Sequence, residues 1–269
     1  MDPAFFVNTV IDSCRSTNDL ARILGDQGYP HGSWISSKVQ ESGRGRLGRE
    51  WLSLDGNLFL SLLIRHEPRT QWTWLPLVAA VGVVGALREL FSSDSAIQNV
   101  TIKWPNDVVV SKRTAVGELE LSKLGGILCE AVGMKTNSCA IVGLGLNCAH
   151  TPQVLDQKVI SLSELLGRSI HADHVREKII QGILTQVAKL SREGTEMIRA
   201  SYMQLSALQL DTPIMWLDSS TGKSMKAQVI GLGPNGELSV RLDSGEKREL
   251  LAEEVKVRLT SKAGDGSLL

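Results

Sequence analysis

Short apolar segments separated by polar turns recur in the first half of the chain. Residues 5–11, 34–39 and 57–64 are rich in β-branched and aromatic side chains, and their pattern predicts strands. Residues 72–91 repeat apolar side chains at spacings of three and four, which predicts a core helix. Residues 101–110 hold two β-branched runs broken by Trp-Pro-Asn-Asp, so we expect two strands joined by a tight bend.

The pattern changes toward the end of the chain. Residues 173–190 and 195–205 have the periodicity of amphipathic helices, and turn-rich sequence with short strands follows from residue 213. The predicted strands are residues 214–217, 226–230, 238–242 and 250–258. This texture is typical of a small β-barrel. We therefore expect an α+β protein with two domains, residues 1–211 and residues 212–269, the second ending in a polar tail.

Composition limits the class of protein. The 269 residues are 42% hydrophobic, and 29 Lys+Arg balance 29 Asp+Glu, which argues against a protein that coats nucleic acid or an anionic membrane. The longest apolar-rich run, residues 75–87, is too short to span a bilayer. No apolar leader is visible and the four cysteines lack C-x-x-C spacing, so we expect a reduced, cytoplasmic protein with buried cysteines.

Residues 39–51 read V-Q-E-S-G-R-G-R-L-G-R-E-W and interleave three glycines with three arginines. Glycine allows positive φ and close approach of backbone N–H groups, while Arg44, Arg46 and Arg49 carry fixed charge suited to phosphate oxygens. The run therefore predicts a loop that wraps an anion such as a phosphate or acyl phosphate. Glycine–arginine runs also occur in disordered RNA-binding segments. The flanking predicted strands favour an ordered loop, but the run alone leaves both interpretations open.

Other polar residues stand where predicted strands end. Ser16, Thr17 and Asn18 precede a helical pattern, as an N-cap or as contacts to a small polar ligand, and the sequence does not decide between them. Asn106 and Asp107 occupy the predicted bend. Lysine at 123, before Gly125-Gly126 and an apolar strand, can bind a carboxylate or phosphate as a point charge.

Four stretches in order make the chain resemble the biotin protein ligases: G-R-G-R-L-G-R, K-W-P-N-D, K-L-G-G-I-L-C-E and G-L-G-L-N. The resemblance implies a mixed β-sheet backed by helices, akin to class II aminoacyl-tRNA synthetases, with an SH3-like C-terminal β-barrel. It implies that biotin and ATP, with Mg²⁺, give biotinyl-5′-AMP and pyrophosphate. A lysine of a biotin carboxyl carrier protein then attacks this anhydride. No DNA-binding segment precedes the first strand, so the resemblance is to the monofunctional form, as monomer or homodimer without nucleic acid or membrane partners.

The resemblance also implies roles for particular residues. The implied catalytic residues are Lys123, Arg44 and Asp107, with Asp107 steering the incoming amine. The implied biotin contacts are Ser16, Thr17, Gln40, Arg44, Lys123 and Gly126. The implied ATP and adenylate contacts are Arg44, Arg46, Arg49, Trp51, Asn106, Lys123 and Asn147, with Trp51 stacking on adenine and Asn147 reading its edge. No metal-ligand residues are implied.

Three observations qualify this interpretation. Residues 110–122 form a longer connection than the family pattern suggests, and Glu50 stands where a basic or aromatic residue is usual. His171 and His174 have the spacing of metal ligands, but without cysteines or acidic residues beside them we expect surface histidines at a helix start. Two rival functions remain: a lipoate–protein ligase, which shares the fold and the adenylate strategy, and a non-catalytic RNA-binding module, which zero net charge and 4% aromatic content disfavour.

Overall fold

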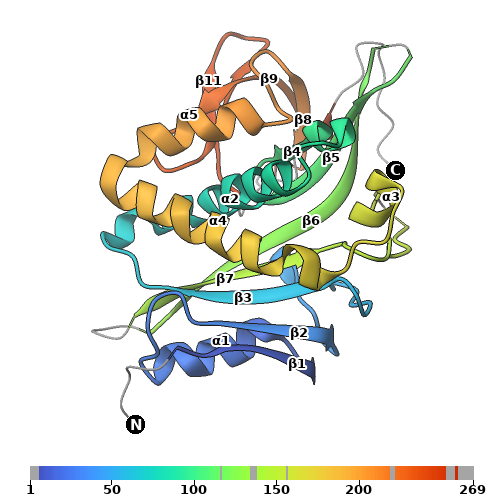
Figure 1. Cartoon of the computed structure of the whole chain (residues 1–269). Coiled ribbons are helices and arrows are strands. Elements are labelled where there is room, and N and C mark those ends of the chain that lie inside the picture. Colours follow the sequence, from blue (N-terminus) through green and yellow to red (C-terminus); the bar gives the residue numbers. More distant parts are fainter. Residues whose placement is uncertain are drawn as a thin grey trace.

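The computed structural model describes residues 6–115, 117–133, 138–155, 157–218, 222–252 and 258–259. Its centre is a seven-stranded sheet in the order β1-β2-β3-β7-β6-β5-β4 (Figure 1). Only β1 and β2 are parallel, and all other neighbours are antiparallel, so the sheet is mixed as predicted. The strands are β1 Asn8–Cys14, β2 Trp34–Gln40, β3 Leu58–Ile64, β4 Val100–Lys103, β5 Asp107–Arg113, β6 Leu119–Val132 and β7 Cys139–Leu146.

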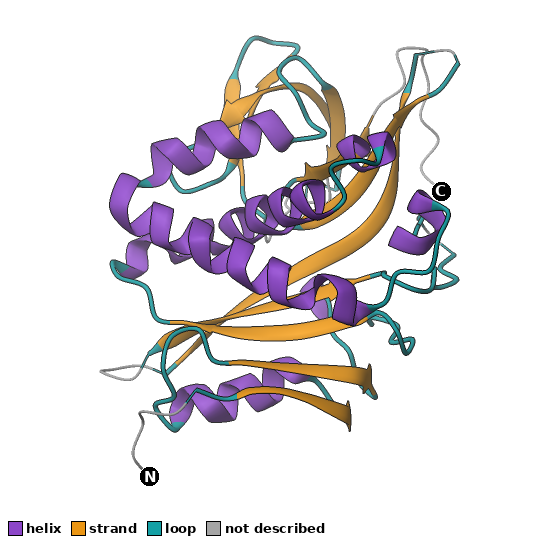
Figure 2. Ribbon diagram, in the orientation of Figure 1, coloured by secondary structure: helices purple, strands orange, loops and turns teal. Residues whose placement is uncertain are grey.

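Helices cover both faces of this sheet because its central strands are apolar on both sides. In β3, Leu62 and Ile64 belong to the main core, whereas Leu63 between them packs in a second cluster with Ala21. This alternation puts helix α1 (Thr17–Asp26) on the face opposite helices α2 (Leu75–Leu90) and α4 (Ala172–Glu193). Figure 2 shows α2, α4 and α5 (Thr195–Leu205) layered against one side of the strands.

Helices α2 and α4 approach each other closely through two glycines. A Cβ added at Gly82 would lie 2.7 Å from Ile183 Cα, and one at Gly182 would lie 2.6 Å from the Gly82 carbonyl oxygen. With the preceding short helix η2, the stretch Arg69–Leu90 is the one described segment whose length and composition could cross a membrane, yet 67% of its most apolar window is buried. It is the core helix that the sequence predicts for residues 72–91.

The C-terminal part is a five-stranded antiparallel sheet in the order β11-β10-β9-β8-β12. Its strands are β8 Pro213–Leu217, β9 Ser224–Leu232, β10 Leu238–Leu242, β11 Lys247–Leu250 and β12 Arg258–Leu259. Within the described residues β11 and β12 are the two edges and do not pair, so the predicted closed barrel is not confirmed. Two buried indoles tie this sheet to the rest: Trp74 Nε1 donates to the Pro234 carbonyl at 3.1 Å, and Trp104 Nε1 to the Gly236 carbonyl at 3.0 Å.

The remaining elements are short. They are the 3₁₀ turns η1 Arg46–Gly48, η2 Arg69–Trp74 and η3 Ser95–Asn99, and helix α3 Leu162–Leu166. Helix α4 begins with a capping box in which the His171 backbone N–H donates to His174 Nδ1 at 2.9 Å. The two histidines therefore stand at a helix start, as the sequence predicts.

Several predicted boundaries are wrong. The first strand begins at Asn8 rather than residue 5, which lies outside the described residues. Of the strand predicted at 250–258, Leu250 is the last residue of β11 and Arg258 the first of β12, residues 251 and 252 are not in a strand, and residues 253–257 lie outside the described residues. The long connection at 110–122 is a hairpin, because β5 continues to Arg113 and β6 already begins at Leu119. Two of the four cysteines, Cys14 and Cys129, are only partly buried. The polar tail lies outside the described residues.

Candidate active site

A cavity of about 170 Å³ opens where six segments meet. The start of α1 and the end of β2 form one end, and the 44–51 loop forms the cover. The β4–β5 bend and the middle of β6 and β7 form the other end and the floor. All but one of the residues predicted for catalysis or for biotin or adenylate binding line this cavity: Ser16, Thr17, Gln40, Arg44, Arg46, Arg49, Trp51, Asn106, Asp107, Lys123 and Gly126. Sequence motifs up to 110 residues apart therefore converge on one site.

The first end of the cavity is polar and uncharged. Ser16 occupies the N-cap position of α1, but its side chain makes no capping hydrogen bond, so capping does not explain this residue. Gln40 Oε1 accepts the Thr17 backbone N–H at 2.8 Å and lies 3.1 Å from Thr17 Oγ1. Ser16 and Thr17 are 4% and 3% exposed, so these hydroxyl groups are largely shielded from solvent except through the cavity.

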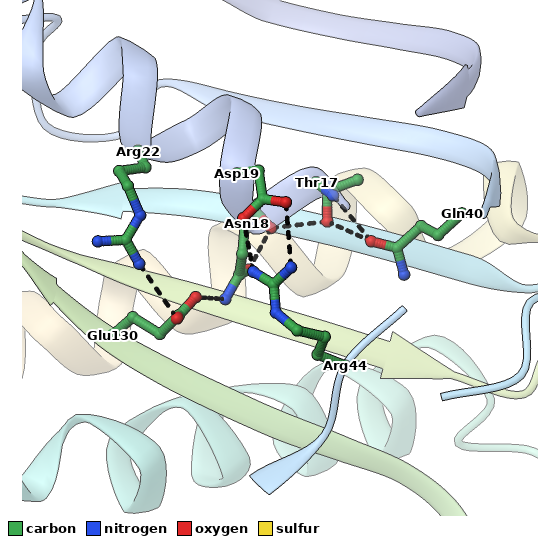
Figure 3. Close-up of polar contacts among 8 residues, drawn as sticks. Thr17, Asn18, Asp19, Arg22, Gln40, Arg44 and Glu130 are labelled. Atoms are coloured by element: carbon green, nitrogen blue, oxygen red, sulfur yellow. Dashed lines mark hydrogen bonds and ion pairs between the residues drawn. The ribbon is translucent and has the colours of Figure 1, made fainter. Parts of the chain in front are cut away.

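The glycine–arginine loop is held in a defined conformation. Leu47 (φ 58°) and Gly48 (φ 70°) adopt left-handed backbone, whereas Gly43 is needed for close approach, because a Cβ there would lie 2.5 Å from the Trp51 carbonyl oxygen. Arg44 binds Asp19 with both terminal nitrogens, at 2.5 and 3.0 Å (Figure 3). Hydrogen bonding to Arg44 lowers the pKa of Asp19 below its ordinary value, and the same contact raises the pKa of Arg44.

The loop also bridges two distant parts of the chain. One terminal nitrogen of Arg46 donates to Asn106 Oδ1 at 3.2 Å, and the other donates to the Ala252 carbonyl at the end of the C-terminal sheet. Asn106 Nδ2 in turn donates to the Ile127 carbonyl at 2.6 Å. The cover of the cavity thus rests on the β4–β5 bend and on the C-terminal sheet together.

The second end of the cavity holds a partly buried ion pair. Lys123 Nζ lies 2.8 Å from Asp107 Oδ1, and the two side chains are 18% and 23% exposed. The sequence places Lys123 before a strand, but it lies inside β6, next to a register shift where Val108 pairs Gly125 and Val109 pairs Lys123. A bulge of this kind re-aims a side chain. Here Lys123 lines the cavity beside the Trp51 ring, 5.3 Å from its centre.

Glycines form the floor under Trp51. A Cβ added at Gly145 would lie 2.4 Å from Trp51 Cε2, and one at Gly126 would lie 3.2 Å from Trp51 Cζ3. The indole Nε1 is buried and has no hydrogen-bond partner among the described residues. The indole therefore packs directly on the two glycines, and this supported indole is a flat surface in the cavity lining on which an aromatic ring can pack.

Asn147 is the predicted site residue that the structure does not bring to the cavity. Its side chain is 2% exposed, and its Nδ2 donates to the Ile160 carbonyl at 3.2 Å. Its Oδ1 is buried without a partner in the described chain. The residue joins β7 to the segment before α3, and its predicted contact to adenine has no support from its position in this structure.

Sequence reasoning named Asn18 but missed three polar residues that lie behind the first end of the cavity: Arg22, Ser61 and Glu130. Asn18 Nδ2 donates to Glu130 at 2.5 Å, and Arg22 donates to the other oxygen of the same carboxylate at 3.1 Å. Ser61, the one polar residue in the fully buried strand L-F-L-S-L-L-I, contacts Asn18 and Thr17 (Figure 3 draws this network). A lone serine in such a strand was the signal that could have identified it.

Comparison with known proteins agrees with the fold and with the motifs. The Biotin/lipoate A/B protein ligase family profile matches residues 10–147. A biotin–[acetyl-CoA-carboxylase] ligase of Paracoccus denitrificans is 28% identical over 86% of this chain and 93% of its own length. The bifunctional ligase/repressor BirA of Bacillus subtilis is 30% identical over 68% of this chain, which spans 53% of the length of that protein.

A solved structure supports the same fold. The biotin protein ligase from Aquifex aeolicus in complex with biotin and ATP superposes with a TM-score of 0.74 at 24% identity, covering 95% of this chain and 100% of that one. At this identity the likeness concerns the fold. The profile match covers more than half of the chain, and the resemblance found in its motifs is confirmed: the chain belongs to the biotin/lipoate A/B protein ligase family.

Proposed function

We propose that this protein attaches biotin to a lysine of a biotin carboxyl carrier protein, using ATP and a biotinyl-5′-AMP intermediate. One observation carries the proposal. A single cavity joins an uncharged polar end at Thr17 and Gln40 to a cationic end at Lys123, under a loop of three arginines. Biotin has the matching polarity, with a neutral ureido ring at one end and a carboxylate at the other.

The polar end favours biotin over lipoate. A ureido ring offers N–H donors and a carbonyl acceptor, which can pair with the buried side chains of Ser16 and Thr17 and with the partly buried side chain of Gln40. A dithiolane ring offers neither, so binding it would leave these polar groups unsatisfied. Sites built to hydrogen-bond a ligand reject analogues that lack the matching groups by large factors, since each unpaired buried group costs about 1–3 kcal/mol.

In the first step, a carboxylate oxygen of biotin attacks the α-phosphorus of ATP, and the bond to the pyrophosphate oxygen breaks. Anions meet in this step, so fixed cations stabilise it more as charge develops than in the ground state. Lys123 at the floor and Arg44, Arg46 and Arg49 in the cover can supply these cations. The flat surface at Trp51, Gly126 and Gly145 would receive the adenine ring.

In the second step, the amine of the carrier lysine attacks the carbonyl carbon of the mixed anhydride, the C–O bond to AMP breaks, and the amine loses a proton. Asp107 is the carboxylate in the cavity nearest to the ammonium of Lys123, and it can orient an incoming amine in the same manner. Bound in turn by Lys123 and by the substrate amine, Asp107 would couple the two steps.

Magnesium fits this site only together with nucleotide. The described residues contain no group of three or more His, Cys, Asp or Glu side chains that could hold a metal ion. Asp107 and Glu50 are the carboxylates in the cavity lining, and Asp107 is already paired with Lys123. Mg²⁺ is often held by one or two carboxylates plus substrate phosphates, where it neutralises developing charge.

Four further assignments belong to the proposal. Residues 1–211 form the catalytic domain, and residues 212–269 form an SH3-like domain, in keeping with the antiparallel C-terminal sheet. The protein works in the cytoplasm, in keeping with four free cysteines. It is a monomer or homodimer. Biotin, ATP and the carrier protein are its partners, without nucleic acid or membrane.

The test uses the purified full chain with ATP and Mg²⁺. Pyrophosphate release is measured with biotin, lipoate or octanoate, and transfer is then measured to a biotin-accepting carrier domain. We expect pyrophosphate release and transfer to the carrier with biotin, but not with lipoate or octanoate. The matched variant Thr17→Val removes one hydroxyl and should raise the biotin KM without changing the low background with lipoate. Comparable turnover of lipoate by the wild type would favour a lipoate ligase instead.

A further inference from the structure

A carboxylate outside the cavity lining begins a chain of hydrogen bonds that ends at the uncharged end of the cavity. Glu130 lies on β6 with its side chain 25% exposed, and it accepts hydrogen bonds from Asn18 and Arg22. From Asn18 a chain of short contacts continues to Ser61, then to Thr17, and ends at Gln40 (Figure 3). Ser61, Thr17 and Asn18 are at most 4% exposed, so each must be satisfied within this chain or by a ligand.

The first link fixes the Asn18 amide. A carboxylate oxygen only accepts hydrogen bonds, and it lies 2.5 Å from the Asn18 side chain, so the NH₂ group of Asn18 must face Glu130. The amide oxygen then faces Ser61 Oγ, also at 2.5 Å. Packing against β7 holds the amide there, because a Cβ added at Gly143 would lie 2.3 Å from Asn18 Oδ1.

The directions of the next hydrogen bonds follow because each hydroxyl group has only one hydrogen to donate. The amide oxygen of Asn18 cannot donate, so the Ser61 hydroxyl donates to it and has no second hydrogen for Thr17. At 2.7 Å the contact between Ser61 and Thr17 then requires Thr17 to be the donor. The single hydroxyl hydrogen of Thr17 is thereby used, and none remains for Gln40 at 3.1 Å.

Two acceptor oxygens consequently lie side by side at the end of the cavity. Gln40 Oε1 is fixed as an acceptor by the Thr17 backbone N–H at 2.8 Å, and Thr17 Oγ1 keeps its lone pairs directed away from Ser61. A pair of acceptors 3.1 Å apart is a binding site for an N–H donor.

We propose that Glu130 is a positioning residue: by fixing the direction of three hydrogen bonds, it leaves Thr17 Oγ1 and Gln40 Oε1 as a paired acceptor for an N–H group of the ligand. This inference rests on the proposed function, in which the ureido ring of biotin supplies that group. Glu130 thus acts on ligand choice through Asn18 and Ser61, without a place in the cavity lining.

Loss of the carboxylate would reverse the chain and leave it satisfied. Without an acceptor at position 130, the Asn18 amide can turn over and donate to Ser61. Ser61 would then donate to Thr17, and Thr17 to Gln40, so that every group from the Asn18 NH₂ to Gln40 keeps a partner, while the Asn18 oxygen turns toward position 130 and Arg22. The reversed chain offers the ligand one acceptor fewer. A variant without this carboxylate is therefore expected to fold normally and to bind biotin weakly.

The test compares Glu130→Met, Glu130→Gln and Arg22→Met in steady-state pyrophosphate release, with thermal melting as a check on folding. For Glu130→Met we expect the biotin KM to rise about 10- to 100-fold, the effect of one mismatched buried hydrogen bond, with kcat and the ATP KM within about threefold of wild type. Glu130→Gln keeps an acceptor oxygen and should restore most of the biotin affinity. Arg22→Met keeps the bond between Glu130 and Asn18 and should match the wild type.

A double-mutant cycle with Ser61→Ala tests the chain itself. Ser61→Ala removes the link between Asn18 and Thr17, so adding Glu130→Met should raise the biotin KM by less than about twofold more. Three outcomes would each overturn the inference while the wild type still uses biotin. They are an unchanged biotin KM in Glu130→Met, equal defects in Glu130→Met and Glu130→Gln, and fully additive effects of Glu130→Met and Ser61→Ala. A wild-type protein that fails to use biotin would instead refute the proposed function, and the inference with it.

Discussion

Replacing Lys123 with methionine isolates the role of its charge. The aliphatic part of the side chain is kept beside Trp51, whose ring centre lies 5.3 Å from Nζ, and only the ammonium is lost. That ammonium lies 2.8 Å from Asp107 Oδ1, and the two side chains are 18% and 23% exposed, so the site is partly excluded from water. We expect the variant to fold and to lose adenylate formation.

The expected losses of stability and of reaction rate in Lys123→Met differ in size. Coulomb attraction at 2.8 Å with an effective dielectric constant near 20 is about 6 kcal/mol, but the cost of removing both charges from water opposes most of it. We therefore expect a loss of unfolding free energy of about 1 kcal/mol. A cation that meets charge developing in the transition state is worth more, about 2.7–4 kcal/mol, which is a 10²- to 10³-fold loss of rate.

The assay is single-turnover pyrophosphate release, with thermal melting in parallel. Lys112→Met, on the exposed end of β5, is the matched control and should change neither measurement. Asp107→Asn breaks the same ion pair but keeps the ammonium, so it should slow biotin transfer to the carrier more than it slows pyrophosphate release. If Lys123→Met melted normally and released pyrophosphate at near the wild-type rate, Lys123 would have no part in adenylation and the proposed first step would be wrong.

Three other outcomes follow from the site. Asp19→Asn should lower the unfolding free energy by about 0.5 kcal/mol at neutral pH. Because Arg44 lowers the folded-state pKa of Asp19, this stabilisation is fully present above the unfolded-state pKa of about 3.9. It is lost as the pH falls through the folded-state pKa, where the carboxyl is protonated in both states, so wild type and variant should then melt alike. Gly145→Ala should displace Trp51 and raise the ATP KM with the biotin KM unchanged, and an unchanged ATP KM would remove the indole from the nucleotide site. Biotin and a non-hydrolysable ATP analogue should each increase the affinity for the other by about 5- to 150-fold in titration calorimetry. Together they should slow tryptic cleavage at Arg46. If each affinity were the same with and without the other ligand, and cleavage were equally fast, closure of the loop over both ligands would be contradicted.

Local patterns predicted much of the fold. Helix α5 matches its predicted range, and β10 matches as well, because periodicity and turn residues act within a few positions of each other. The bend at 101–110 was also predictable, since proline and Asn-Asp restrict the backbone locally. The order of strands was not, because β3 pairs with β7 across an intervening helix and three strands, and no local rule encodes that choice.

The candidate site was likewise predictable from the sequence only in part. Residues identified by motifs, such as Arg44 and Lys123, do line the cavity, because a motif match predicts site residues without requiring the fold to be predicted first. Contacts between motifs were invisible: Asp19 to Arg44 across 25 positions, and Asn18 to Glu130 across 112. Such pairs depend on how the strands and helices assemble, and the bulge that redirects Lys123 is likewise a property of the assembled sheet.

The contacts of Trp74 and Trp104 with the turn at Pro234–Gly236 limit how far this protein can be shortened. Both indoles are at most 2% exposed, and their N–H groups have their acceptors on the C-terminal sheet. Side chains of that sheet, including Val229 and Val240, also belong to the same continuous core as α2. A fragment cut at residue 211 would expose two tryptophans to water and remove the carbonyl acceptors of their N–H groups. A minimal version of this protein would therefore have to retain the chain through at least Leu250.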